Sequence, residues 1–249
     1  MTKVTTVPSP AGRFMSSVDG PPSWSVVIPV KRLHRAKSRL AGLAGNRRWE
    51  LALAVCLDAV RATLACRAVQ RVVVVTDDHH AATALRELPR AERALMITDD
   101  VPDAGLNPAL RHGATIASRQ DPGLGVAALS ADLPALRPEE LARVLAAANR
   151  APRSFLADAA AVGTTLYAVR DVDSGGFTPA FGGSSRARHR GQDVVELDLR
   201  GVDSVRRDVD TPADLRAAAA LGLGPVTGAL LADLAPHLML GPDGTTRAR

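Results

Sequence analysis

The chain has 249 residues, 46% of them hydrophobic and 23% charged, which is typical of a globular protein with a substantial core. Its 31 lysines and arginines outnumber 26 acidic residues and are spread along the chain, which argues against a nucleic-acid-binding arm and allows a small anionic ligand. Two cysteines exclude a disulfide framework, and no run approaches the roughly 20 apolar residues that span a bilayer, so we expect a cytoplasmic protein without membrane or nucleic-acid partners.

The first half of the chain alternates between two kinds of segment. Residues 1–22 are rich in Pro, Ser, Thr and Gly, which predicts a disordered leader. Continuous apolar runs predict buried parallel strands over 24–30, 71–76, 94–98 and 125–131. Helices are expected between them, over 47–68, after Asn107 and over 137–148. This alternation predicts a doubly wound α/β sheet with helices on both faces, in a single domain that spans residues 23–240.

The second half changes character. Two strands joined by a turn are expected over 154–160 and 163–169, and a long polar stretch rich in Gly and Arg covers 174–191. A stretch of that length inside a compact domain is more often functional than idle. Further strands are predicted over 194–199 and 204–209, followed by helices from Pro212 and from about Val226, and a disordered tail over 241–249.

A basic loop leaves the first strand at the place where open α/β sheets bind their ligands, beyond the carboxyl ends of the strands. It reads PVKRLHRAKSRL, residues 29–40, and Lys31, Lys37 and Arg39 are the candidates to contact a triphosphate. The Gly-x-x-x-x-Gly-Lys spacing of a P-loop is missing. The alternative is a solvated basic turn.

Three aspartates follow predicted strands. Asp132 ends the strand GVAALSA, and Asp208 and Asp210 lie two residues apart in RRDVDTPADL, so on a strand both would project from one face. The residues 211–214, TPAD, already supply a complete helix start, which leaves Asp208 without a local capping role. Carboxylate oxygens suit Mg²⁺, so the three aspartates are predicted to bind this ion, with turn or helix capping as the alternative.

Two further polar clusters have open interpretations. Asn107, in a Gly-Leu-Asn turn, is either a helix N-cap or a contact to a base or ribose. Residues 163–165, GTT, and 181–189, FGGSSRARH, offer backbone N–H groups, hydroxyls and arginines to an anion, although a surface loop would have the same composition. The motifs of serine hydrolases and of dinucleotide-binding dehydrogenases are both absent.

Taken together, these segments resemble a known enzyme family. Their sequences and their order, from about residue 24 to 220, are similar to those of guanylyltransferases that make the deazaflavin coenzyme factor 420. The segments are PVKRLHRAKSRLA, DAGLNPALRHG, SADLPAL, GTT, FGGSSRARH and RRDVDTPADL. These enzymes are described as acting on 2-phospho-L-lactate or on phosphoenolpyruvate. The resemblance implies a three-layer α/β/α nucleotide-diphospho-sugar transferase fold, which is Rossmann-like with a mixed, mostly parallel sheet.

The resemblance also implies roles for individual residues. Asp132, Asp208 and Asp210 match the metal-binding aspartates of the family, and Lys37 is expected to assist catalysis beside them. Lys31, Arg39 and Asn107 are expected on the nucleotide. Thr164, Gly182 and Ser185 match the residues of the family around the carboxylate of phosphoenolpyruvate, and Thr165, Ser184 and Arg186 are further candidates for contact with the acceptor. The family loop reads Phe-Gly-Pro-Gly-Ser, whereas this chain has Phe-Gly-Gly-Ser-Ser, which leaves open whether Ser184 or Ser185 binds the acceptor.

The implied reaction is transfer of GMP from GTP to phosphoenolpyruvate with release of pyrophosphate, assisted by Mg²⁺. Alternatives are the same transfer to 2-phospho-L-lactate or 3-phosphoglycerate, a related nucleotidyltransferase acting on a sugar phosphate or a molybdopterin, and a nucleotide-binding protein without catalytic activity. The oligomeric state is open, with a homodimer as one option.

Overall fold

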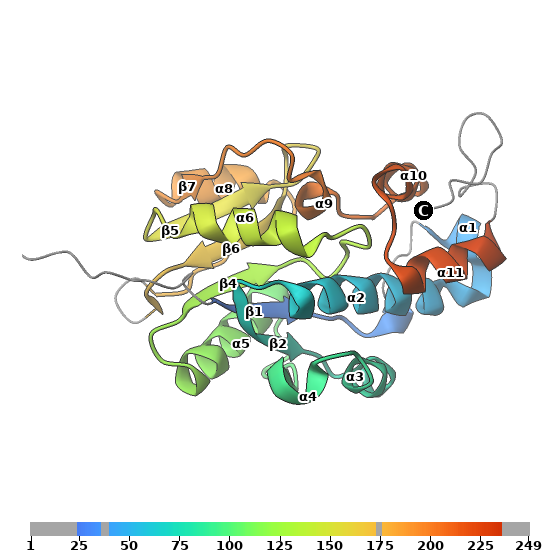
Figure 1. The fold of residues 1–249 in the computed structure, drawn as a ribbon, viewed down its shortest axis with the longest axis horizontal. Helices are drawn as coiled ribbons and strands as arrows, with labels where there is room; N and C mark the ends of the chain where they lie inside the picture. The colour runs from blue at the N-terminus through green and yellow to red at the C-terminus, as the bar shows by residue number, and fades with distance from the viewer. Residues whose placement is uncertain (1–23, 36–39, 173–175, 236–249) are drawn as a thin grey trace, which may run out of the picture.

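The computed structural model describes residues 24–35, 40–172 and 176–235, and a seven-stranded sheet forms the middle of its three layers (Figure 1). The strand order is β3-β2-β1-β4-β6-β5-β7. The strands are β1 (Trp24–Pro29), β2 (Val69–Val75), β3 (Leu95–Thr98), β4 (Gly125–Leu129), β5 (Arg153–Ala157), β6 (Thr164–Val169) and β7 (Val195–Glu196). Only β6 runs antiparallel to its neighbours, β4 and β5. The predicted α/β class with a mixed, mostly parallel sheet is therefore confirmed.

Helices cover both faces of this sheet (Figure 1). The longer ones are α2 (Arg48–Ala65), α3 (His79–Arg86), α5 (Leu106–Gln120), α6 (Pro138–Ala148), α10 (Pro212–Leu221) and α11 (Pro225–Leu234). Shorter helical segments are η1 (Leu33–Arg35), α1 (Ala41–Ala44), η3 (Gly45–Arg47), α4 (Ala91–Ala94), α8 (Ser185–Gly191) and α9 (Asp203–Arg206). The leader and the tail expected at the two ends of the chain lie outside the described residues.

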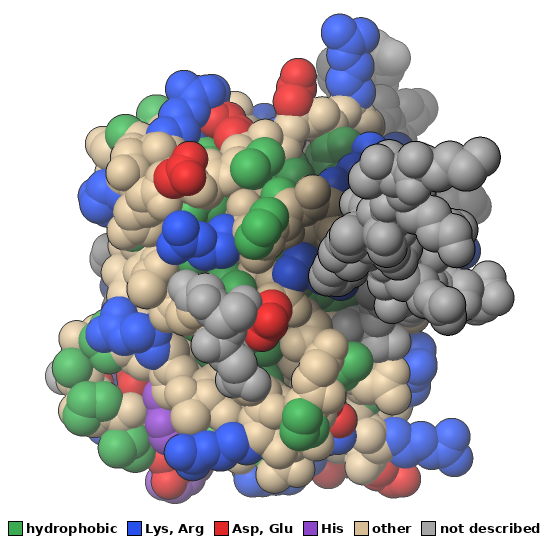
Figure 2. Space-filling model, turned by 90° about the vertical axis from the view of Figure 1, so that its left-hand side faces the viewer, with side chains coloured by type: hydrophobic (Ala, Val, Ile, Leu, Met, Phe, Trp, Pro, Cys, Tyr) green, Lys and Arg blue, Asp and Glu red, His purple; other side chains and the backbone are tan. Residues whose placement is uncertain are grey.

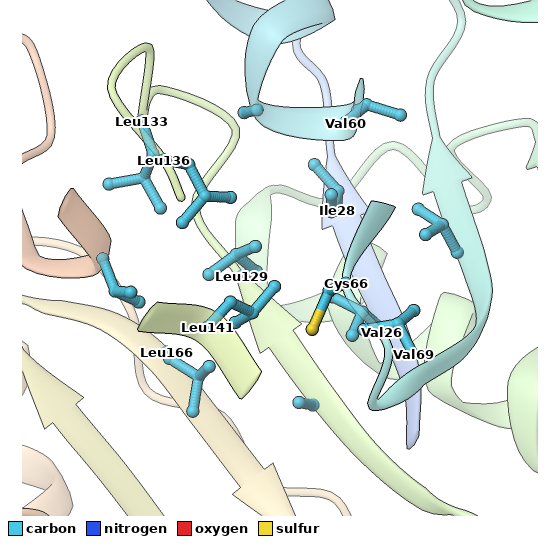
Figure 3. Close-up of a cluster of buried hydrophobic side chains, with 14 of the residues drawn as sticks. Val26, Ile28, Val60, Cys66, Val69, Leu129, Leu133, Leu136, Leu141 and Leu166 are labelled. Carbon is cyan, nitrogen blue, oxygen red and sulfur yellow. The ribbon is translucent and has the colours of Figure 1, made fainter. Parts of the chain in front are cut away.

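The core divides at the sheet because successive strand residues point to opposite faces. In β1, Val26 and Ile28 pack on the side of α2 and α6, and Val27 packs on the side of α5. Figure 3 shows the first of these clusters, in which Leu129 of β4 and Leu141 of α6 meet the β1 side chains. Full burial of each such side chain contributes about 1.5–3 kcal/mol, so this continuous core fixes the strand ends relative to one another.

One predicted strand is wrong and bears directly on the candidate site. Residues 204–209 do not form a strand, because Asp203–Arg206 form the helical turn α9 and the residues after it belong to no strand. A tertiary contact outweighs the local pattern here: Glu140 Oε2 of α6 accepts hydrogen bonds from the backbone N–H of Ser204, at 2.9 Å, and from its hydroxyl, at 2.8 Å. Val205 is fully buried beneath this contact.

Three smaller differences also concern segments near the site. The strand expected over 194–199 is reduced to the two residues of β7, and the stretch 174–191, expected as a loop, contains α8. Asn107 is not an N-cap, because α5 begins at Leu106 and Gly105 occupies the cap position.

The expected helix starts at residues 211–214 and near Val226 are confirmed. Thr211 and Asp214 form a capping box, with Asp214 N–H donating to Thr211 Oγ1 and Thr211 N–H donating to Asp214 Oδ2. The start of α11 is capped from a distance: the buried carboxylate of Asp58 accepts the backbone N–H groups of Val226 and Thr227. The start of α10 at residues 211–214 therefore forms as the sequence predicts.

The end of the molecule at which β1 begins is shown in Figure 2. Where the described residues are visible on this face, basic and acidic side chains are interspersed. Over the described ranges, no helix is both long enough and apolar enough to cross a membrane.

Candidate active site

A cavity of about 250 Å³ opens where β1 and β4 end, between α2 and α5. Its walls combine apolar side chains with a few charged ones, the pattern expected of a small-molecule site. The charged side chains on its wall are Lys31, Asp132 and Asp210, and Phe181 reaches it from the segment that precedes α8. The cavity thus lies at the edge of the sheet where the sequence places its candidate residues.

A backbone hydrogen bond brings the three predicted metal ligands to one place. The N–H of Val209 donates to the carbonyl oxygen of Asp132 at a distance of 3.0 Å. Val209 is fully buried, and Asp208 and Asp210 flank it on the segment between α9 and α10. The predicted proximity of the three aspartates is present, although it arises from this pairing and not from a strand.

Asp208 carries the strongest electrostatic perturbation in this region. Burial, together with the negative charges of Asp132, Asp158 and Asp210, raises the pKa of Asp208 to about 7. Four carboxyl groups therefore converge, and such a concentration of like charge is the environment in which a divalent cation is most strongly stabilised. Among the described residues, however, no three Asp, Glu, His or Cys side chains are arranged closely enough to hold a metal ion.

Asp158 was missed by the sequence analysis. Its two carboxylate oxygens accept the N–H groups of Val162, at 2.9 Å, and Gly163, at 2.8 Å, which closes the turn between β5 and β6. A Cβ atom on Gly163 would lie 2.4 Å from Asp158 Oδ2, so only glycine fits there without displacing the carboxylate. The Asp-to-Gly-Thr-Thr spacing was visible in the sequence, but its proximity to Asp208 was not.

The basic loop after β1 is anchored to the end of β2. Leu33 N–H donates to Asp78 Oδ2 at 2.8 Å, and Arg32 forms an ion pair with Asp77 at 3.7 Å. These contacts place Lys31 on the wall of the cavity. Lys37 and Arg39, the other two predicted triphosphate contacts, lie outside the described residues.

A second cavity, of about 190 Å³, adjoins the first and shares Lys31 and Leu106 with it. It extends to the ends of β2 and β3, where Asp77, Asp100 and Asp103 line it. Asp100 N–H donates to Asp77 Oδ1, and Asp100 Oδ1 is buried without a hydrogen-bond partner. Burial and the neighbouring charges of Asp77 and Asp103 raise the pKa of Asp100. This buried acceptor is a further site feature that the sequence did not reveal.

The two threonines of the GTT step have different surroundings. Thr164 is buried, and its hydroxyl lies 3.0 Å from Nδ1 of His189, which comes from α8. Thr165 is also buried, and its hydroxyl has no hydrogen-bond partner, while its carbonyl oxygen accepts Ser130 N–H at the end of β4. Both threonines therefore lie at the sheet edge that carries Asp132, next to the strand end.

The FGGSSRARH segment combines a glycine turn with α8. Gly182 and Gly183 both have positive φ, at 95° and 46°, which only glycine adopts readily. Ser185 is buried at the start of α8, and Ser184 is exposed at the N-cap position without a side-chain cap bond. Arg186 bonds Glu196 Oε1 at 2.8 Å and the carbonyl oxygen of Ala161, so its guanidinium braces the turn between β5 and β6.

Asn107, which follows the cavity-lining Leu106, is hydrogen-bonded to this segment. Its side-chain amide donates to the carbonyl oxygen of Phe181 at 3.1 Å and accepts the Phe181 N–H at 2.8 Å. The amide thus pairs with the backbone as a neighbouring strand would. The predicted nucleotide contact of Asn107 stays a prediction, and the observed role is support of the loop.

Comparison with known proteins identifies the family. A family model described as "Guanylyl transferase CofC like" matches residues 24–227. The chain belongs to this family. Among its curated relatives, the phosphoenolpyruvate guanylyltransferase of Thermomonospora curvata is 57% identical over 217 residues, covering 87% of this chain and 92% of the relative. The enzyme of the same name from Streptomyces coelicolor is 56% identical over 212 residues, with coverages of 85% and 97%.

A solved structure supports the fold of this CofC-like guanylyltransferase. A protein from Desulfovibrio desulfuricans, described as a nucleotide-diphospho-sugar transferase, superposes with a TM-score of 0.62 at 16% identity, covering 86% of this chain and 96% of that one. The expected nucleotide-diphospho-sugar transferase fold is confirmed. The family match covers every candidate residue named above, from Lys31 to Asp210.

Proposed function

We propose that this protein transfers GMP from GTP to phosphoenolpyruvate and releases pyrophosphate. The observation that carries the proposal is the 57% identity to an enzyme of that name over 87% of the chain. The geometry supports it: two adjoining cavities, converging aspartates and a cationic side chain meet at the carboxyl edge of the sheet.

The reaction is a single displacement at phosphorus. A phosphate oxygen of phosphoenolpyruvate attacks the α-phosphorus of GTP, the new P–O bond forms, and the bond from the α-phosphorus to the bridging oxygen breaks as pyrophosphate departs. The product is enolpyruvyl-diphospho-guanosine. The attacking oxygen is already ionised near neutral pH, so the site needs positioning and charge neutralisation more than a strong base.

Charge repulsion is the main obstacle to this encounter. Two unit charges at about 4 Å repel by roughly 4 kcal/mol at an effective dielectric constant of 20, and both substrates carry several. Lys31, on the wall that both cavities share, is placed to offset part of this charge. Lys37 and Arg39 are proposed to assist from the same loop.

Asp132, Asp208 and Asp210 are the residues proposed to hold Mg²⁺, although their side chains as placed do not form a complete ligand set. The raised pKa of Asp208 supports the proposal, because a cation would offset the negative charges that disfavour its ionised form. The bound ion would polarise the α-phosphate and balance the charge of the leaving pyrophosphate. Asp158, fixed by its own turn, adds to the negative potential that favours the ion.

The second cavity is the proposed guanine subsite. Guanine presents two adjacent donors, N1–H and the N2 amino group, and a carboxylate is the side chain that accepts both together. Asp100 brings a buried, unpartnered carboxylate oxygen to this cavity. The first cavity, next to the aspartates, would then receive the phosphates.

The acceptor is proposed to lie against Thr164, Gly182 and Ser185, with Thr165, Ser184 and Arg186 close by. The glycine turn supports this placement because neither Gly182 nor Gly183 donates its N–H to another of the described residues, so both are available to an anion.

One assay tests the proposal. The purified protein is supplied with Mg²⁺, one nucleoside triphosphate and one acceptor, chosen from phosphoenolpyruvate, 2-phospho-L-lactate, 3-phosphoglycerate and a sugar phosphate, and pyrophosphate is measured. We expect release with GTP and phosphoenolpyruvate. Faster release with 2-phospho-L-lactate or 3-phosphoglycerate would assign that compound as the acceptor in place of phosphoenolpyruvate. Release of pyrophosphate only with CTP and a sugar phosphate, or no release with any pair, would overturn the proposal.

A further inference from the structure

His189 is the most completely buried histidine near the candidate site, with no exposed surface. Its ring stacks on Tyr167 of β6, with centroids 5.0 Å apart and an angle of 20°, and lies against Phe155 and Phe181. Burial, with a smaller effect of the charge on Arg188, lowers the pKa of His189 to about 4. The imidazole is therefore neutral in the physiological range and carries one proton.

Two hydrogen bonds determine which nitrogen carries that proton. The backbone N–H of Ala180 donates to His189 Nε2 at 3.0 Å, and an amide N–H can only donate, so Nε2 must be the unprotonated nitrogen. The proton then lies on Nδ1, which is 3.0 Å from the hydroxyl oxygen of Thr164. His189 is the donor in this contact and Thr164 Oγ1 is the acceptor. The hydroxyl proton of Thr164 is consequently available to donate in another direction.

His189 thereby ties together two segments that are distant in sequence. Thr164 is the first residue of β6, and Ala180 lies two residues before the glycine turn. Two other side chains complete the attachment of that turn: Asn107 bonds both backbone groups of Phe181, and Arg188 Nε and Nη2 donate to the carbonyl oxygen of Ala180. Every backbone N–H and C=O of Ala180 and Phe181 is thus bonded to a side chain, which fixes the turn relative to Thr164.

We propose that His189 is a positioning residue for the acceptor substrate: its Nδ1–H holds Thr164 so that the threonine hydroxyl donates to a carboxylate oxygen of the acceptor. Its Nε2 accepts the N–H of Ala180 and so holds the turn of Gly182 and Gly183. One buried ring therefore sets the distance between Thr164 and this turn, the two parts of the acceptor subsite. The inference rests on the proposed function, because it assigns Thr164 and the turn to that substrate. It adds a residue that does not itself contact the substrate.

A purely structural role for His189 would predict a different pattern. A buried aromatic ring that only fills space is replaced by phenylalanine with loss of stability alone, and the kinetic constants of the folded fraction stay unchanged. A positioning role predicts a selective rise in KM for the acceptor.

Substitutions at His189 and Thr164 separate the two roles. His189→Phe keeps the ring and loses both bonds, His189→Asn keeps a donor near the Nδ1 position, and His189→Gln keeps an acceptor near the Nε2 position. We expect His189→Phe to raise KM for phosphoenolpyruvate by about 10-fold to 100-fold, as loss of hydrogen bonding to a charged group predicts, while KM for GTP changes by less than about 2-fold. His189→Asn should recover more of the loss than His189→Gln.

A double-mutant cycle checks that His189 acts through Thr164. Thr164→Val removes the hydroxyl with little change of shape, so the loss in Thr164→Val/His189→Phe should be smaller than the sum of the two single losses, with a remainder from the lost bond between Nε2 and Ala180 N–H. Tyr167→Phe keeps the ring that stacks on His189 and serves as the matched control. Fully additive effects, or equal changes in KM for both substrates, would overturn the inference.

Nitrogen NMR of the imidazole in the substrate-free protein tests the geometry without any activity. We expect the Nδ1–H tautomer at pH 7 in the wild type, and the Nε2–H tautomer would overturn the inference. Absence of GMP transfer by the wild-type protein would instead overturn the proposed function, so the two failures are distinguishable. If His189→Phe does not fold, KM for phosphoenolpyruvate in His189→Asn and His189→Gln, together with the tautomer of the wild type, tests the inference.

Discussion

The backbone N–H of Val209 donates to the carbonyl oxygen of Asp132 at 3.0 Å, and this bond joins two segments that are 77 residues apart in the chain. Because Val209 is buried, the backbone of the two aspartates beside it is held close to Asp132. The convergence of charge at Asp208 follows from this pairing, and the first two predictions concern its consequences.

Asp208→Asn should abolish guanylyl transfer and stabilise the metal-free protein at pH 8. The substitution removes a charge that burial and three neighbouring carboxylates disfavour, and at about 1.4 kcal/mol per pK unit the rise from 3.8 to about 7 corresponds to a gain in free energy of unfolding of at most about 4 kcal/mol. Chemical denaturation at pH 8 and pyrophosphate release measure the two effects. Asp198→Asn, at an exposed aspartate, is the control, and near-normal turnover of Asp208→Asn would remove this residue from the proposed metal site.

The stability of the metal-free protein should fall between about pH 4 and pH 7, the range between the ordinary pKa of an aspartate and the value of about 7 for Asp208. The folded state keeps the proton that the unfolded state releases, so the contribution of Asp208 is fully present below pH 4 and is lost as the pH rises through 7. Mg²⁺ must displace that proton, and its stabilisation should therefore be larger at pH 8 than at pH 6. Thermal unfolding with and without Mg²⁺ at both pH values checks this; equal shifts would contradict it.

Gly163→Ala should destabilise the fold by about 1–3 kcal/mol, because the new Cβ would meet Asp158 Oδ2 at 2.4 Å. The displaced carboxylate would loosen the turn that leads into Thr164, so KM for the acceptor should rise as well. Gly228→Ala in α11, where a Cβ meets nothing within 4 Å, is the matched control and should be neutral or slightly stabilising. Wild-type stability of Gly163→Ala would show that the turn relaxes freely.

Asn107→Ala should raise KM for the acceptor and leave KM for GTP nearly unchanged, because the amide of Asn107 supports the backbone of Phe181. Steady-state kinetics with each substrate varied in turn measures the split. A selective rise in KM for GTP would favour the nucleotide contact that the sequence suggests for this residue.

Asp100→Asn should reduce kcat/KM for GTP by about 10-fold to 100-fold, since loss of a charged acceptor at a buried site costs that much. Inosine triphosphate, which lacks the N2 amino group, should already be a poor substrate of the wild type and should be less affected by the substitution. Asp99→Asn changes the exposed neighbour and is the control. An equal loss with both nucleotides would place Asp100 outside the guanine subsite.

The sequence by itself determined the elements whose residues carry their own signal. The runs WSVVIPV and RVVVVT predicted β1 and β2 because a strand covered on both faces must be apolar throughout, and Thr211 and Asp214 predicted the start of α10 because a capping box is complete within four residues. Asp132 was chosen because it follows β4 at the carboxyl edge of the sheet, whereas Asp208 and Asp210 were chosen from a strand that the structure does not contain.

Only the tertiary structure decided what depends on contacts between distant segments. Glu140 turns residues 203–206 into a helical turn although their local pattern favours a strand, and Asp158 gains its electrostatic influence only by lying near Asp208. His189, in a stretch that is otherwise polar and rich in arginine, is buried because Tyr167, Phe155 and Phe181 surround it. Burial, pKa and hydrogen-bond direction depend on the residues that lie close in space. Those residues are distant in the sequence, so they are known only from the folded structure.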